Sequence, residues 1–460
     1  MLNFTSSNGL YGDYKQIDYS HVWHPFTQFS DWRSYDPIII ESGHGVYLQD
    51  VNGNKYLDGV SSLWCNVHGH CVGEIDKAVH AQVDKISHST LLGLSHSPIC
   101  ELSLRLNKVT PAHITRFFYA DSGSTAVEAA LRMAIEWWHK QNGVSNKKNK
   151  LVSLLGGYHG DTLGAVGVGY LEHFHSALSS MVSHVNRVTP PHVNRFYSNM
   201  SELSALSSSV EELEQFFKLH GDKTAAMIIE PLVQGAAGIW VHSIEYLQEV
   251  YRLCKKYDVF IIVDEVATGF GKTGTLFAFE QAGIEPDFLV LAKGLSAGYF
   301  PISVVCTTNR VFDGFVGMPS SLRTFFYGQT FAGNPVAAAA AIANLDLFSS
   351  RPILENVRNL SLHLKAELDA NIAGLEHVDE IRQCGLMVGI ELTKLPNAHL
   401  AYDPDERVGL KIVLEARKRG CIIRPLGNTI VLMPALSMKA SEITELVYVT
   451  KESIISATKN

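Results

Sequence analysis

Two residues that directly follow apolar stretches of the sequence could carry chemistry. Asp264 comes after Val259–Val263, and Lys293 comes shortly after Phe288–Leu291. If both stretches are buried parallel strands, the two side chains lie at carboxyl ends of strands, where such sheets place their sites. Burial makes a lysine amine a usable nucleophile, and a fixed carboxylate beside it can keep a pyridine nitrogen protonated. Pyridoxal phosphate needs this combination. Taken singly, a snorkelling lysine and a helix-capping aspartate explain the two residues equally well.

The segment Asp121–Thr125 (DSGST) could bind a phosphate, because it lies between a short apolar run and an expected helix at 126–138. Thr125 and Glu128 are spaced as a capping box. Gly123 would let an anion approach the free N–H groups of the helix N-terminus. An ordinary capped helix is the structural alternative.

Two further segments follow the same logic. The segment 156–161 (GGYHGD) comes directly after an expected strand, so Tyr158 could lie flat against a planar cofactor or could simply anchor a loop. The segment 328–335 (GQTFAGNP) opens an alanine-rich helix, where Gln329 and Thr330 suit a phosphate or merely a turn.

Short apolar runs alternate with longer helical patterns through the middle of the chain. The runs are rich in β-branched and aromatic residues and have little polar alternation, which is typical of strands buried on both faces. They lie at 117–119, 151–155, 226–229, 259–263, 288–291 and 302–305, with helices such as 126–138 and 244–257 between them. This alternation predicts an α/β fold with a mainly parallel sheet and helices on both faces.

The two ends of the chain differ from this pattern. Residues 38–58 alternate around a turn at Val51–Asn54, which predicts a small antiparallel hairpin. After Asn344 we expect a helix, a strand at Met387–Leu392, a helix at Val408–Arg419, and strands around Ile423 and Val431. We therefore expect a large domain at 73–345. The N-terminal segment, 1–72, and the C-terminal part, 346–460, should together form a smaller α+β domain.

Composition restricts the possible partners and the location. The 460 residues are 46% hydrophobic and 18% charged, with a formal net charge of −8, which is an ordinary globular balance. Without a basic cluster, nucleic-acid and anionic-membrane partners are not expected. No apolar run is long enough to span a bilayer, residues 1–10 lack the features of a signal peptide, and the seven cysteines are scattered. These features favour reduced thiols in a cytoplasmic protein.

Three other motifs point elsewhere. Phe260–Glu265 and Gly271–Thr273 together suggest a nucleotide-binding ATPase, but position 266 is Val where the phosphate loop needs Gly, and the two parts occur in the wrong order. The group Cys65, His68, His70 and Cys71 looks metal-like, but no second pair follows at zinc spacing, so we expect no metal. Gly164–Gly169 is glycine-rich, and we expect a tightly packed strand there.

In combination, these motifs resemble the class III, ornithine-type aminotransferases of pyridoxal phosphate fold type I. The matching segments keep their order and spacing over nearly the whole chain; they are the DSGS turn, GYHGD, IIEPLVQGAAG, VDEVATGFGKTG, LAKGLSAGY and GQTFAGNP. The resemblance implies pyridoxal 5′-phosphate as the cofactor and a homodimer with shared active sites.

The resemblance also implies roles for individual residues. Lys293 would form the Schiff base and move the proton, Asp264 would pair with the pyridine nitrogen, and Tyr158 would stack near the ring. The phosphate would be held by Gly123 and Ser124, together with Gln329 and Thr330 of the other subunit.

The flanking segments HVWHPFTQ (21–28), DGVSSLW (58–64) and IRPLG (423–427) resemble a narrower group. These family members convert 8-amino-7-oxononanoate to 7,8-diaminononanoate in biotin biosynthesis, with S-adenosylmethionine or, in some members, lysine as amino donor. The implied partner of the substrate carboxylate is Arg424, which suits a bidentate contact. The other implied substrate-site residues are Leu63, Trp64, Tyr158, Lys293 and Gly328.

Four positions depart from the family pattern. Familiar members carry tyrosine at Phe26, which the resemblance places at the catalytic centre, and a second tryptophan at Leu63. They carry tyrosine at Val431 and arginine at Lys272. Three of the four should line the substrate pocket. These departures affect which amino donor the pocket is expected to accept. A class III enzyme that acts on a diamine or an ω-amino acid remains an alternative.

Overall fold

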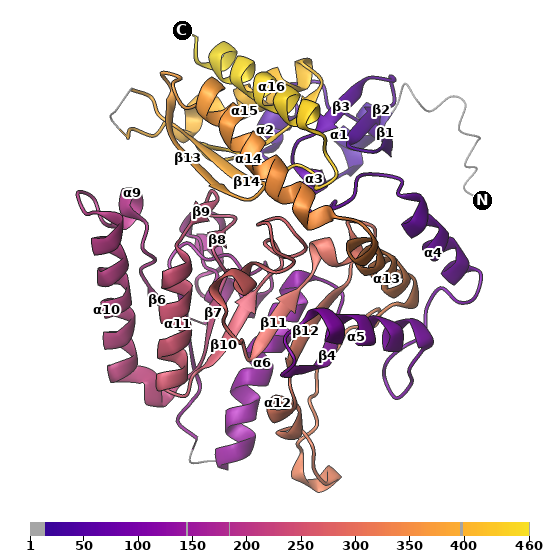
Figure 1. Cartoon of the computed structure of the whole chain (residues 1–460), viewed down its shortest axis with the longest axis vertical. Helices are drawn as coiled ribbons and strands as arrows, with labels where there is room; N and C mark the ends of the chain where they lie inside the picture. The colour runs from indigo at the N-terminus through magenta and orange to yellow at the C-terminus, as the bar shows by residue number, and fades with distance from the viewer. Residues whose placement is uncertain (1–13, 144–145, 184, 396–398, 460) are drawn as a thin grey trace.

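The computed structural model describes residues 14–143, 146–183, 185–395 and 399–459. Figure 1 shows two parts: a larger lower part around an extended sheet, and a smaller upper part that contains both the beginning and the end of the described chain.

The large part is built on a seven-stranded sheet with the order β4-β12-β11-β10-β7-β5-β6. Strand β12 is antiparallel to both of its neighbours, while β11, β10, β7, β5 and β6 pair in parallel, so the predicted mainly parallel sheet is confirmed. The bounds are β4 Ile114–Ala120, β5 Lys150–Leu154, β6 Asn186–Val188, β7 Thr224–Ile229, β10 Phe260–Asp264, β11 Phe288–Leu291 and β12 Ser303–Thr308.

Both faces of this sheet are buried. Along β10, Ile261 and Val263 belong to one apolar cluster, whereas Phe260 and Ile262 belong to another. Successive side chains of a strand point to opposite faces, so helices must cover both. The helices of the large part are α4 Gly73–Val83, α5 Ser97–Val109, α6 Gly123–Asn142, α7 Leu163–Val168, α8 Glu172–His175, α9 Val193–Phe196, α10 Glu202–His220, α11 Ile244–Lys256, α12 Asn309–Asp313 and α13 Pro335–Ser350.

The small part joins the two ends of the chain. Strand β3 pairs antiparallel with β2 and parallel with β15, so the predicted N-terminal hairpin is extended by a C-terminal strand. This pairing joins Leu57 and Asp58 to Cys421 and Ile422, residues from the two segments that were expected to form the smaller domain. The bounds are α1 Tyr14–His21, α2 Phe29–Trp32, β1 Ile40–His44, β2 Tyr47–Asp50, β3 Lys55–Asp58, α3 Ser61–Trp64, α14 Ile353–Asn371, β13 Val378–Cys384, β14 Met387–Leu392, α15 Val408–Lys418, β15 Cys421–Ile422, β16 Arg424–Leu426, β17 Thr429–Leu432 and α16 Ala440–Thr458. A short pair, β8 Val233–Gln234 and β9 Trp240–Val241, lies between the two parts (Figure 1).

Two local predictions were wrong. Gly164–Gly169 is not a strand, because Leu163–Val168 forms helix α7. The capping box of α6 joins Ser122 and Thr125 rather than Thr125 and Glu128. Glu128 instead accepts hydrogen bonds from the backbone N–H groups at the start of α7, which explains why a helix forms there. Among the described residues, no helix is long and apolar enough to cross a membrane.

Candidate active site

A cavity of about 480 Å³ lies where the strand ends of the large sheet face the small part. Nine of the residues singled out from the sequence line it: Phe26, Leu63, Trp64, Gly123, Ser124, Tyr158, Asp264, Lys293 and Arg424. Segments far apart in the sequence therefore meet at one site.

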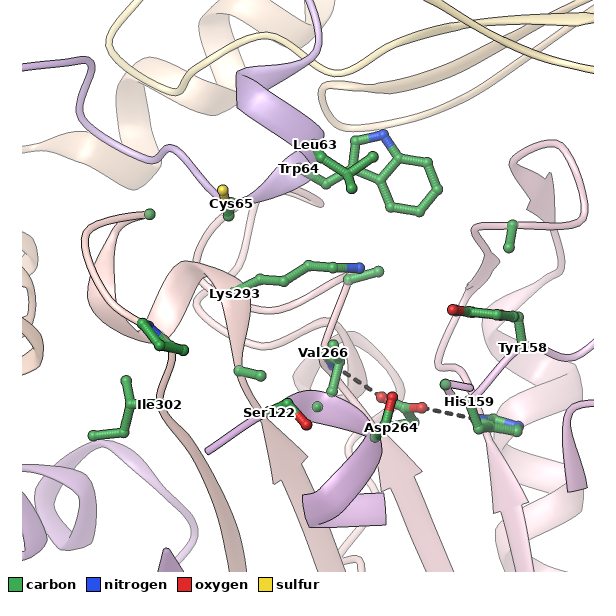
Figure 2. Close-up of a pocket in the computed structure, with 18 of the residues that line it drawn as sticks. Leu63, Trp64, Cys65, Ser122, Tyr158, His159, Asp264, Val266, Lys293 and Ile302 are labelled. Atoms are coloured by element: carbon green, nitrogen blue, oxygen red, sulfur yellow. Dashed lines mark hydrogen bonds and ion pairs between the residues drawn. The ribbon is translucent and has the colours of Figure 1, made fainter. Parts of the chain in front are cut away.

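Asp264 is fixed at the base of the cavity. It is the last residue of β10, which pairs in parallel with β11, so the predicted neighbouring strand ends are confirmed. One carboxylate oxygen lies 2.7 Å from Nδ1 of His159, and the other accepts a hydrogen bond from the Val266 N–H at 3.0 Å. Figure 2 shows both interactions. The carboxylate is thus held in one orientation, with its charge next to the cavity.

Lys293 extends into the same cavity, between Asp264 on one side and Trp64 on the other (Figure 2). Its Nζ lies 4.9 Å from the Trp64 ring centroid and makes no hydrogen bond or ion pair within the described part of the chain. Burial lowers the pKa of Lys293, although the carboxylates of Asp264 and Glu230 act against this. A half-buried amine with a lowered pKa and no polar partner among the described residues is suited to nucleophilic attack on a carbonyl carbon.

The N-terminus of α6 forms a second wall. Ser122 is its N-cap, and its hydroxyl accepts a hydrogen bond from the Thr125 N–H. A Cβ at Gly123 would lie 2.8 Å from a methyl carbon of Val266, so only glycine fits. The first N–H groups of a helix have no partner inside it, and Gly123 and Ser124, the first residues of α6, line the cavity. This arrangement can bind a phosphate.

Among the residues that line the cavity, sequence reasoning missed His159 and Glu230, which contribute polar groups to it. Glu230 accepts hydrogen bonds from the Tyr158 and Gly235 N–H groups at 3.1 and 2.8 Å. Burial raises its pKa to about 7, although His159 acts in the opposite direction. The signal was available, because Glu230 follows the buried strand β7 just as Asp264 completes β10. His159 lies inside the GYHGD segment from which only Tyr158 was selected.

The opposite side of the cavity is formed by an unusual turn. Ser61, Ser62, Leu63 and Trp64 all have positive φ, between 46° and 69°. Left-handed backbone costs a non-glycine residue roughly 1–2 kcal/mol, so four in succession require strong support from the surroundings. Nothing in the sequence indicates this conformation. Trp64 is 6% exposed, and its indole N–H is buried without a partner.

Arg424 lies on β16, with its Nε buried and without a hydrogen-bond partner. No carboxylate of the described residues forms an ion pair with it. Burial lowers its pKa, but an arginine keeps its charge. An unpaired guanidinium that lines a cavity can bind an anionic group of a ligand. At the cavity edge, Phe26 and Phe174 meet edge to face, with ring centroids 5.5 Å apart.

Three predicted site residues, Gly328, Gln329 and Thr330, do not line the cavity of the single chain. The buried Oε1 of Gln329 has no hydrogen-bond partner among the residues that the structure describes. Val431 was expected in the pocket, but it is fully buried within β17 and does not line the cavity. Lys272 is also buried; burial, and after it the charge of Lys293, lowers its pKa to about 8.

The metal-like group of the sequence does not converge. His68 Nε2 contacts Asn344, His70 Nε2 contacts Asp58, and Cys71 contacts the Gly43 carbonyl. Within residues 14–143, 146–183, 185–395 and 399–459, no group of three or more potential ligands could hold a metal ion.

The chain belongs to the aminotransferase class-III family, whose profile matches residues 30–454. It is therefore a pyridoxal phosphate-dependent aminotransferase. It is 44% identical over 446 residues to the adenosylmethionine-8-amino-7-oxononanoate aminotransferase of Nitratidesulfovibrio vulgaris, covering 97% of this chain and 82% of that protein. The crystal structure of the enzyme of that name from Methanocaldococcus jannaschii superposes with a TM-score of 0.90 at 35% identity, covering 96% and 98% of the two chains. An (S)-enantioselective omega-transaminase from Thermomicrobium roseum superposes with a TM-score of 0.92 at 29% identity, covering 97% and 98%.

The cavity fits pyridoxal phosphate. Its donors and acceptors match the parts of that molecule: the half-buried amine of Lys293 for the aldehyde, a fixed carboxylate for the ring nitrogen, and a helix N-terminus for the phosphate. Lys293, Asp264, and Gly123 with Ser124 are the residues that would supply these contacts. Tyr158, from the same cavity wall as His159, would lie beside the ring.

Proposed function

We propose that this enzyme transaminates 8-amino-7-oxononanoate to 7,8-diaminononanoate, the biotin-pathway reaction. Relatives between 34% and 44% identical over nearly the whole chain carry the corresponding enzyme name. The structural observation that carries the proposal is Arg424, which lines the cavity and whose buried Nε has no hydrogen-bond partner among the described residues. The keto substrate ends in a carboxylate, which would supply one.

Each of several cavity residues has its own role in the proposed reaction. Bound pyridoxal phosphate supplies the electron sink that stabilises negative charge at the substrate carbon. Asp264, oriented by His159, would keep the ring nitrogen protonated, and the Lys293 amine would accept and return the proton at that carbon. Arg424 would bind the carboxylate at the end of the substrate and so orient its acyl chain. Trp64 covers Lys293 and keeps water from the amine.

An ester control tests the assignment of the substrate. The methyl ester of 8-amino-7-oxononanoate keeps the reacting carbonyl but loses the charge that Arg424 would bind. We expect the acid to be accepted with a KM at least about tenfold lower than that of the ester, because a charge-assisted contact is lost. Equal use of both compounds would favour an amine transaminase such as the one from T. roseum.

We propose S-adenosylmethionine as the amino donor and keep lysine as the alternative. The adenine and the sulfonium favour aromatic faces, which Phe26 and Trp64 offer, whereas Leu63 offers less of such surface than a tryptophan would. The test is a single-turnover experiment in which the enzyme is mixed with each donor alone and the cofactor absorbance is followed. Conversion by lysine and not by S-adenosylmethionine would refute this assignment and direct attention to positions 26 and 63.

We further propose a homodimer with shared sites. Gly328, Gln329 and Thr330 lie outside the cavity of their own chain. Gln329 and Thr330 could therefore complete the phosphate site of a partner, and Gly328 could line its substrate site. A fully active monomer in sedimentation would contradict this proposal. We also propose a cytoplasmic location, which the seven free cysteines support.

A further inference from the structure

The left-handed turn at Ser61–Trp64 must be held by groups outside it. L-residues avoid this conformation because Cβ approaches the following carbonyl oxygen. Its own backbone bonds, Trp64 N–H to the Val60 carbonyl and Cys65 N–H to the Ser61 carbonyl, would form in a right-handed turn as well. The preference for the left-handed form therefore comes from side-chain contacts.

One such contact joins the Ser61 hydroxyl to the Met433 carbonyl oxygen at 2.6 Å, and Asp58, the last residue of β3, makes two more. Its carboxylate accepts hydrogen bonds from the Ser62 N–H at 3.0 Å and from the Ser62 hydroxyl at 2.7 Å. The same carboxylate lies 3.1 Å from Nε2 of His70. Burial alone would raise the pKa of Asp58, but the hydrogen bonds from His70 and Ser62 lower it below its usual range. A charged, buried carboxylate thus holds both partners.

His70 is itself fixed in one orientation. The Asn66 carbonyl oxygen Oδ1 accepts from the Gly69 N–H at 2.7 Å, so the Asn66 amide nitrogen must face Nδ1 of His70, 3.1 Å away. Nδ1 is then an acceptor, and Nε2 carries the hydrogen that it donates to Asp58. The His70 backbone exchanges two hydrogen bonds with Gly45. A Cβ at Gly43 would lie 2.9 Å from the imidazole, so glycine leaves the space that the ring needs.

We propose that Asp58, Ser62 and His70 form a clamp that keeps the turn 61–64 left-handed and so positions Trp64 over the catalytic amine. None of the three lines the cavity, so they act through the turn. Trp64 lies between Lys293, 4.9 Å from its ring, and Gly235, where a Cβ would come within 3.2 Å of the indole. A turn that relaxes to the right-handed form would withdraw the indole from this space. The inference rests on the aminotransferase assignment and not on the identity of the substrate.

The first test is Asp58→Asn, with Asp50→Asn as the matched control. Asp50 is also buried and accepts four hydrogen bonds, from Asn52, Asn54 and Tyr56, but it contacts neither the turn nor the cavity. Asp58→Asn should raise amide hydrogen exchange in segment 59–66 of the apoenzyme by about tenfold or more, because the local opening becomes easier. Asp50→Asn should leave that segment unchanged.

The same variants are then loaded with cofactor and mixed with S-adenosylmethionine and with lysine, and the donor that converts the wild type is used. Asp58→Asn should lower kcat/KM by about tenfold to a hundredfold, as expected for a misplaced positioning group, while the cofactor absorbance is retained. A kcat/KM within about twofold of the wild type would overturn the clamp, since a misplaced Trp64 must cost more. If neither donor converts the wild type, the proposed substrates fail, and the exchange experiment still decides on the clamp.

A glycine rescue separates positioning from general stability. Glycine adopts positive φ without penalty, so Ser62→Gly in the Asp58→Asn background should recover kcat/KM at least about threefold. No recovery would mean that Asp58 acts in some way other than by holding the turn. Should Asp58→Asn not fold, Ser62→Ala, which removes only the hydroxyl contact, replaces it. Unchanged exchange and unchanged kcat/KM in Ser62→Ala would count against the clamp.

Discussion

Two sides of one cavity are built by different means. Asp264, His159, Glu230 and Lys293 form a strand-end group, fixed by a sheet whose two faces are both buried. The facing side, with Phe26, Trp64 and Arg424, comes from the N-terminal segment and from the C-terminal strand β16. The strand-end group matches the family motifs, whereas the facing side contains the departures Phe26 and Leu63. We therefore propose that the chemistry belongs to the buried sheet and that substrate choice belongs to the part that the chain ends assemble.

The largest effect should come from Lys293. Lys293→Ala removes the only amine that lines the cavity in the described structure, so transamination should fall to the background level and borohydride should no longer trap the cofactor on the protein. Lys272→Met is the matched control, because Lys272 is buried but lies outside the cavity lining. It should retain the trapped adduct. An adduct in Lys293→Ala at any other lysine would break the assignment of the strand-end group.

Asp264→Asn should be next in size. The contacts to phosphate and amine remain, so cofactor should still bind, but the ring nitrogen loses the charge that keeps it protonated. Removal of such an electrostatic partner costs several kcal/mol, which corresponds to roughly a hundredfold to a thousandfold in kcat. The measurement is single-turnover conversion at neutral pH together with the cofactor spectrum. Turnover near that of the wild type would mean that Asp264 is not the partner of the ring.

Arg424→Ala tests the facing side and should have a smaller effect that depends on the substrate. Loss of a charge-assisted contact costs about 1.5–3 kcal/mol, so the KM for 8-amino-7-oxononanoate should rise by about tenfold to a hundredfold. Arg424→Lys keeps the charge but loses the planar fork, so its KM should lie between that of the wild type and that of Arg424→Ala. The methyl ester should be insensitive to both changes. A loss of kcat with KM unchanged would place Arg424 with the strand-end group instead.

The strand-end group could be predicted from the sequence more fully than the facing side of the cavity. Asp264 and Lys293 could be predicted because a buried strand has a visible pattern and its end has a fixed place in a parallel sheet. Glu230 carried the same signal and was overlooked. The left-handed turn at 61–64 could not be foreseen, since local preference disfavours it and the contacts proposed to hold it, Ser62 with Asp58 and Asp58 with His70, are seen only in the folded chain. For the same reason, the burial of Val431 in β17 required the tertiary structure.

The smallest expected effect is on the pH dependence of the free energy of unfolding, and it comes from Glu230 of the strand-end group. The folded pKa of Glu230 is about 7 against an ordinary value of 4.5, because burial disfavours its charged form. Between about pH 4.5 and 7 the folded state therefore binds more protons at this site than the unfolded state, so stability falls as pH rises through that window. Glu230→Gln cannot ionise and should remove this slope, by at most about 1.4 kcal/mol per pH unit. Its amide can replace only one of the two accepted hydrogen bonds, which lowers the free energy of unfolding by an amount that does not change with pH.

The measurement is the free energy of unfolding of the apoenzyme at several pH values from 5 to 8. The control is Glu249→Gln, because Glu249 is a surface carboxylate paired with Arg252. Parallel pH profiles for Glu230→Gln and the wild type would show that Glu230 is already ionised in the folded protein, which would place a second fixed negative charge beside Asp264 and Lys293.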